Sequence, residues 1–227
     1  MDFPDSRASR FAWFRLLAAR VATFWPAKMI GTTAGMAAFF AVYLWILQHP
    51  LRPPLVMPLT AVDRWIGFWP GALPLYLSLW LYVSLAPALL TDRRELISLA
   101  LGAVAMSAVG LGTFLIWPTA VPTPDVEWAR YPSFAFLKSV DASGNACPSL
   151  HVAFAVFTAR WFGHLFRNGQ AATWLRVGNW LWCVGIVYST VATRQHVSLD
   201  VLAGAVLGGG IATINLRWLN SRRFTPA

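Results

Sequence analysis

Six apolar runs, each near the length of about twenty residues with which a helix crosses a lipid bilayer, set the strongest limit on how this chain folds. Charged residues make up only 12% of the chain, well below the ~25% typical of a soluble domain. This composition excludes an ordinary soluble fold. We predict an all-α, polytopic membrane protein with six transmembrane helices at 29–47, 72–90, 97–117, 149–165, 175–193 and 197–216.

Lys and Arg residues are distributed unequally among the segments that connect these runs. Thirteen of the 18 lie in the N-terminal arm, in the connections after the second and fourth runs, and at the C-terminus. Cytoplasmic segments carry the excess of Lys and Arg in membrane proteins. We therefore expect a protein of the bacterial inner membrane with both termini in the cytoplasm. The connections 48–71, 118–148 and 194–196 would then lie on the outer, periplasmic side.

The two ends of the chain differ from its apolar middle. In the arm 1–28, aromatic and aliphatic residues recur at helical spacing between arginines, which is typical of an amphipathic helix at the membrane interface. A disordered arm is the alternative. We expect 29–217 to form the membrane domain and 218–227 a basic tail. The net charge of +9 favours membrane lipids over nucleic acid as partners, because the basic residues form no continuous stripe.

Two of the four histidines lie in short polar strings, and each string leads into an apolar run. In the second string Asp200 follows His196 by four residues, which places both side chains on one face of a helix. An ionisable residue inside a span is energetically unfavourable, and it is therefore a candidate for function. The carboxylate would accept a hydrogen bond from one imidazole nitrogen and leave the other as a nucleophile. A His–Asp pair that only holds helices together is the alternative.

The first string, residues 147–151, places His151 at the start of the fourth run. Free N–H groups at a helix N-terminus bind anions, and the Ser149 hydroxyl would add a donor to such a phosphate cradle. Arg194 lies two residues before His196, and a guanidinium binds phosphate oxygens in a bidentate manner. The alternatives are simple helix capping by Ser149 and a solvated or lipid-anchoring charge at Arg194.

Together the strings provide the groups that phosphoryl transfer requires, namely a nucleophile, an acid for the leaving group and positive charge near the phosphate. The charge distribution, which is independent of the motifs, places both strings on the outer side. We predict that His196 attacks phosphorus and becomes a phosphohistidine, that His151 protonates the leaving oxygen, and that Asp200 orients His196. Ser149 and Arg194 would bind the substrate.

We expect no cofactor and no metal at this site. A metal site formed by His151, His196 and Asp200 is conceivable, but the sequence contains no closely spaced ligand pair of the usual kind.

At these residues the chain resembles the type 2 phosphatidic acid phosphatase superfamily, whose membrane members are six-helix integral proteins. Pro148, Ser149 and His151 match the second motif of that family. The first motif, Lys-x6-Arg-Pro, is absent. The third motif, Ser-Arg-x5-His-x3-Asp, is matched by the spacing of Ser189, His196 and Asp200.

One residue of the third motif departs from the family, because Thr190 occupies the position of its arginine. Arg194 would substitute for that arginine from a shifted position. The loss of basic residues also resembles the inositolphosphorylceramide synthase and sphingomyelin synthase branch, in which the phospho-headgroup passes to a lipid alcohol.

The resemblance implies metal-independent phosphoryl chemistry on a phosphorylated lipid. We therefore predict a lipid phosphate phosphatase. A phospholipid headgroup transferase is the first alternative, and a non-catalytic lipid-binding or transport protein is the second. The sequence identifies neither the lipid nor the oligomeric state.

Overall fold

Long α-helices account for most of the chain, as the apolar runs predict. The computed structural model describes residue 15 and residues 17–134 and 144–221. Its helices are α2 (Trp25–Gln48), α3 (Ala61–Ile66), α4 (Leu73–Leu77), α5 (Leu79–Leu89), α6 (Arg93–Ile116), α8 (Leu150–Asn168), α9 (Thr173–Ala192) and α10 (Ser198–Ser221), with short 3-10 turns at Pro70–Ala72, Trp128–Arg130 and Pro132–Phe134. Strands β1 (Leu55–Val56) and β2 (Thr119–Ala120) form one parallel pair. The all-α prediction is confirmed.

Among the residues that the structure describes, four stretches are long and apolar enough to cross a membrane, namely Trp25–Gln48, Pro70–Leu89, Arg93–Ile116 and Ser198–Ser221. Helices α8 and α9 coincide with the fourth and fifth apolar runs. However, α8 contains Arg160 and Arg167, and α9 contains Arg176. The count of six spans therefore stays a prediction.

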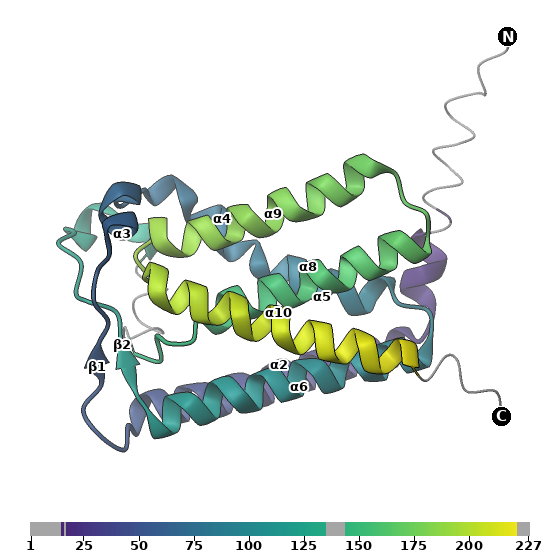
Figure 1. Cartoon of the computed structure of the whole chain (residues 1–227), viewed down its shortest axis with the longest axis horizontal. Helices are drawn as coiled ribbons and strands as arrows, with labels where there is room; N and C mark the ends of the chain where they lie inside the picture. Colours follow the sequence, from purple (N-terminus) through teal and green to yellow (C-terminus); the bar gives the residue numbers. More distant parts are fainter. Residues whose placement is uncertain (1–14, 16, 135–143, 222–227) are drawn as a thin grey trace, which may run out of the picture.

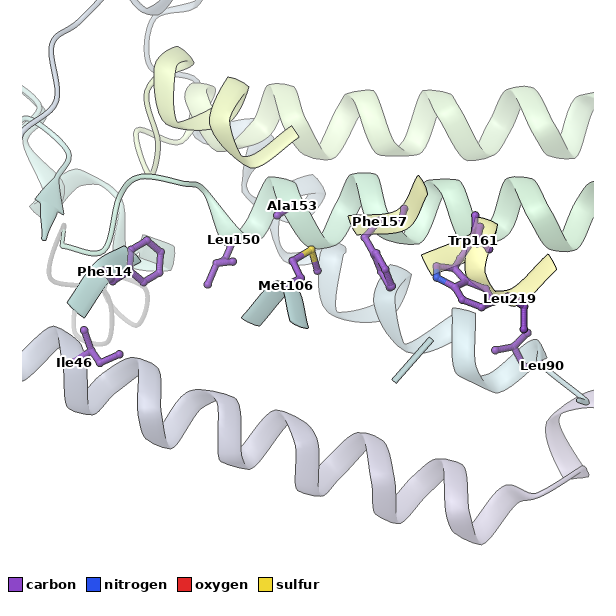
Figure 2. Close-up of a cluster of buried hydrophobic side chains, with 11 residues drawn as sticks. Ile46, Leu90, Met106, Phe114, Leu150, Ala153, Phe157, Trp161 and Leu219 are labelled. Atoms are coloured by element: carbon purple, nitrogen blue, oxygen red, sulfur yellow. The ribbon is translucent and has the colours of Figure 1, made fainter. Parts of the chain in front are cut away.

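Helix α8 forms the centre of the bundle. Helices α5, α6, α9 and α10 all pack against it, and its buried residues cover most of its circumference, whereas the face with Arg160 and Arg167 is exposed. Figure 2 shows Leu150, Ala153, Phe157 and Trp161 following one another along α8 and facing Met106 of α6 and Leu219 of α10. The position of α8 therefore fixes the positions of the helices around it.

The two ends of the bundle carry different elements (Figure 1). Helices α8 and α10 begin, and α2, α6 and α9 end, at the end that also carries β1, β2 and α3. We refer to this end as the strand end and to the opposite end as the arm end. The described chain begins and finishes at the arm end.

Helices α8 and α10 touch backbone to backbone near the strand end. A Cβ added at Gly204 would collide with the carbonyl oxygen of Ser149, and one at Gly208 would collide with that of Ala153. Only glycine permits so close an approach. The starts of the two helices, which carry the two polar strings, are therefore held side by side.

Most of the predicted amphipathic arm, and residues 222–227 of the predicted basic tail, lie outside the described residues. The last four residues that we assigned to the arm form the first turn of α2, which begins at Trp25.

Candidate active site

His196 and Asp200 form a buried pair at the start of α10. The Nδ1 atom of His196 lies 3.1 Å from Oδ2 of Asp200, so the structure contains the contact that the spacing predicts. Asp200 is fully buried, whereas the His196 side chain is 11% exposed. When Nδ1 carries the proton and donates it to the carboxylate, the lone pair of the imidazole is on Nε2 of His196.

The helical register that we assumed for this pair differs slightly from the structure. His196 lies two residues before α10, which begins at Ser198, and Asp200 lies in the first turn. The imidazole therefore reaches the carboxylate from the turn that precedes the helix.

His151 is the second residue of α8, and it is held by aromatic side chains. Its ring stacks on that of Tyr76 in α4, with 4.0 Å between centroids and 12° between planes. The ring of Trp80 in α5 meets it edge-on at 6.3 Å. Ser149, two residues before His151, donates its N–H to the carbonyl oxygen of Asp200, the partner of His196. The two histidines, 45 positions apart in the sequence, therefore belong to one site.

Two buried polar atoms of this site have no hydrogen-bond partner within the described part of the chain. They are Nε2 of His151 and Oδ1 of Asp200. Buried polar atoms are nearly always paired in folded proteins, and the exceptions concentrate where a ligand or a reaction uses them. Both atoms are therefore candidates for a contact with a bound substrate or with an ordered water.

Ser149 acts as the N-cap of α8. Its hydroxyl oxygen accepts a hydrogen bond from the N–H of Val152 at 3.3 Å, and the residue is fully buried. Helix α8 begins at Leu150, so Pro148 precedes the cap and does not lie in the first turn. The N–H of Ser149 donates to the carbonyl oxygen of Asp200, which connects the two strings directly.

Arg194 lies beside α3. It adopts a left-handed backbone conformation with φ of 58°, and its Nη1 donates to the carbonyl oxygen of Asp63 at 3.0 Å. Thr190, at the position of the family's arginine, is buried and donates its hydroxyl to the carbonyl of Val187. The predicted role of Arg194 in substrate binding stays a prediction.

Tyr76 and Asp63 are absent from the sequence-based site. Tyr76 lies in an aromatic-rich apolar run, where nothing distinguishes a ring that stacks on histidine from one that faces lipid. Asp63 has a local signal, because Thr60-x-x-Asp63 has the form of a capping box, and the structure contains that box at the start of α3.

The electrostatics of Asp63 follow from its surroundings. Burial alone would raise the pKa of its carboxyl, but hydrogen bonds from the N–H groups and hydroxyls of Thr60 and Ser198 outweigh burial and hold that pKa below its ordinary value. Asp63 is therefore a carboxylate at neutral pH.

No cluster of three or more His, Cys, Asp or Glu side chains that could hold a metal occurs among residues 17–134 and 144–221.

Residues 96–224, more than half of the chain, match the family model of the PAP2 superfamily. The chain belongs to the PAP2 superfamily. The matched region of this PAP2 protein includes His151, His196 and Asp200, and it begins after Asp63 and α3. The resemblance to the type 2 phosphatidic acid phosphatase superfamily is therefore confirmed. Neither the curated proteins nor the solved structures include a match to this PAP2 protein.

Members of the superfamily are generally phosphatases or phosphotransferases. The family and the apolar helices together make this PAP2 protein an integral membrane protein of that general kind.

Proposed function

We propose that this PAP2 protein is a lipid phosphate phosphatase that acts through a phosphohistidine on His196. The observation that supports this most is the His196–Asp200 contact at the start of α10, which is bonded directly to the start of α8, the helix that carries His151. The direct contact between the starts of α8 and α10 maintains that placement.

The reaction would proceed in two steps. In the first, Nε2 of His196 attacks phosphorus, the bond from phosphorus to the lipid oxygen breaks, and His151 donates its proton to that oxygen. In the second, a water molecule gives a proton to His151 and attacks the phosphohistidine, which releases phosphate and restores both imidazoles. The Asp200 carboxylate stabilises the positive charge that His196 acquires on attack.

A phospholipid headgroup transferase is the second candidate. It is favoured by the departures from the family motifs, since Thr190 replaces an arginine and the first motif is absent. In this reaction the substrate of the first step would be a phospholipid, and His196 would carry its phospho-headgroup. A lipid alcohol would then take the place of water in the second step, so that a new phosphodiester forms. The third candidate is a protein that binds or transports lipid without catalysis.

The test is to incubate the purified protein with a panel of labelled lipid phosphates and headgroup-labelled phospholipids, with and without a diacylglycerol of different chain length as an acceptor alcohol. Release of free phosphate in both conditions supports the phosphatase. A labelled phospholipid that forms only with the alcohol supports the transferase. The absence of turnover across the panel supports the non-catalytic alternative.

Two variants complete this test. His196→Ala is expected to abolish turnover, and an unchanged rate would remove the nucleophile assignment. Asp125→Asn alters an exposed carboxylate of the segment that follows β2 and should leave the rate unchanged. We expect activity to persist in EDTA.

We also propose that the strand end faces the outer, periplasmic side of a bacterial inner membrane and that both termini are cytoplasmic. The distribution of Lys and Arg supports this orientation. Trp65→Cys, in α3 at the strand end, should react with an impermeant maleimide added to spheroplasts above the wild-type background. Gln170→Cys, in the exposed turn between α8 and α9 at the arm end, should not. The reverse pattern would invert the orientation.

A further inference from the structure

A carboxylate outside the family-matched region holds the chain that carries His196. Asp63 of α3 is fully buried, and it lies 135 positions from Ser198, the first residue of α10. Its Oδ1 accepts the backbone N–H of Ser198 at 2.6 Å, and its Oδ2 lies 2.9 Å from the Ser198 hydroxyl. The carboxylate of Asp63 therefore binds the start of α10 from a different helix.

The contact has the physical character of a helix cap. The first N–H groups of a helix have no partner within the helix, and negative charge near them is stabilising. Asp63 provides both the acceptor and the charge for α10. Thr60 supports the carboxylate, because its N–H donates to Oδ2 of Asp63 at 2.7 Å. The Thr60 hydroxyl also lies 2.7 Å from the hydroxyl of Ser198, which is a further contact between α3 and α10.

A second bond joins the same two segments on the other side of His196. The guanidinium of Arg194 donates to the backbone carbonyl of Asp63 at 3.0 Å. Arg194 and Ser198 each lie two residues from His196, so one residue of α3 holds the chain both before and after the imidazole. The N–H groups of Gln195 and His196 both reach the carbonyl of Thr190, which closes the turn from the α9 side.

We propose that Asp63 is a positioning residue for the His196–Asp200 pair. This inference rests on the proposed function and adds a residue to it. Asp63 does not touch the reacting atoms. It fixes the turn from which His196 reaches both Asp200 and the substrate, and a displacement of a reacting group by about 1 Å can lower a rate by about 100-fold.

The first test is the turnover of Asp63→Asn, which keeps the shape of the side chain but has one acceptor oxygen and no charge. We expect kcat to fall roughly 10- to 100-fold with little change in KM, because the substrate still binds while the nucleophile is displaced. Asp125→Asn is the matched control, since it makes the same chemical change on an exposed carboxylate. A kcat of Asp63→Asn equal to that of the wild type would overturn the proposal.

A second variant approaches the same contact from α10. Ser198→Pro removes both the N–H and the hydroxyl that Asp63 binds, and proline is favoured at the first position of a helix. If both variants disrupt one contact, the double variant Asp63→Asn/Ser198→Pro should be no slower than the slower single variant. If the loss of kcat in the double variant equalled the product of the losses in the two single variants, the proposal would be contradicted.

A readout independent of turnover separates this proposal from the proposed function. Diethyl pyrocarbonate modifies neutral imidazoles, and mass spectrometry reports its rate at His196, with the exposed His49 as the internal standard. Loosening of the turn in Asp63→Asn should raise the rate at His196 by about threefold or more, as local opening does for other protected groups. Asp125→Asn should leave the rate unchanged.

The outcomes are distinguishable. If the wild type turns over no lipid phosphate but His196 is modified faster in Asp63→Asn than in the wild type, the proposed function is wrong and the positioning role remains. Equal modification rates in wild type and Asp63→Asn, both folded by thermal melting, would remove the positioning role whatever the activity.

Discussion

The backbone N–H of Ser149 donates a hydrogen bond of 3.0 Å to the carbonyl oxygen of Asp200. This bond joins the N-cap of α8 to the first turn of α10, and therefore joins the element that carries His151 to the element that carries Asp200. The distance between the packed helices α8 and α10 consequently decides whether the two histidines can act on one substrate.

Gly204→Ala tests this dependence. The added Cβ would meet the carbonyl oxygen of Ser149, a backbone atom that cannot rotate away, so the helices must separate. We expect a destabilisation of about 1–3 kcal/mol, as in other overpacked cores. We also expect turnover to fall at least about tenfold, because the groups that act together are displaced from one another. Thermal melting and the lipid phosphate assay measure the two effects.

Gly210→Ala is the matched control on the same helix. A Cβ at Gly210 meets no atom within 4 Å, and alanine is the better helix former, so stability and turnover should be kept. Equal turnover of Gly204→Ala and Gly210→Ala would show that close packing of α8 on α10 does not matter to the site.

His151→Ala should produce a loss that depends on the leaving group. If His151 protonates the leaving oxygen, the loss for a lipid alkyl phosphate should be about 100- to 10,000-fold, the usual contribution of a general acid. The loss should be much smaller for p-nitrophenyl phosphate, whose leaving phenolate needs no proton. The measurement is kcat/KM of the wild type and the variant for both substrates.

The exposed His49 provides the control for this experiment. His49→Ala removes an imidazole from the strand end and should change neither rate. Equal losses of His151→Ala on both substrates would point to a role of His151 in binding and not in proton transfer.

The helices of this fold are largely predictable from the sequence, because membrane-spanning segments must be long and apolar. The structure starts or ends them within a few residues of the apolar runs. It also divides the second run at Ser78 into α4 and α5. The strands are not predictable, since a pair of two-residue strands is too short to produce an alternating pattern.

The candidate site divides in the same manner. The His196–Asp200 contact is local, so the spacing of four residues predicts it. The stacking of Tyr76 on His151 and the bonds of Asp63 to Ser198 join segments far apart in the chain. No periodicity within one segment contains that information, and only the packing of α3 and α4 against the other helices reveals it.

Cys147 should react slowly with alkylating agents at neutral pH. Burial, together with the negative charge of Asp200, raises the pKa of its thiol above the ordinary value. The thiolate is the reactive form, so alkylation by iodoacetamide should become fast only above the ordinary thiol pKa of about 8.5. Peptide mass spectrometry across pH 6–10 measures the profile, and Asp200→Asn should shift it towards lower pH.

Cys183 reports on unfolding in the same sample, because it is buried and should be labelled only in denaturant. Alkylation of Cys147 at the rate of an exposed thiol at pH 7, with Cys183 unlabelled, would contradict the raised pKa.

Asp63→Asn should lower the melting temperature at neutral pH, and the difference from the wild type should shrink in acid. The folded state holds the pKa of Asp63 below its ordinary value, so the unfolded chain binds a proton at higher pH than the folded chain does. The stability that the ionised carboxylate contributes is therefore fully present above the unfolded pKa of about 3.9 and is lost as the pH falls through the folded pKa.

Melting curves of wild type and variant between pH 7 and pH 3 measure this. Asp125→Asn, whose carboxylate is exposed, should track the wild type throughout, and a constant difference for Asp63→Asn over the whole range would mean that the charge of Asp63 does not stabilise the start of α10.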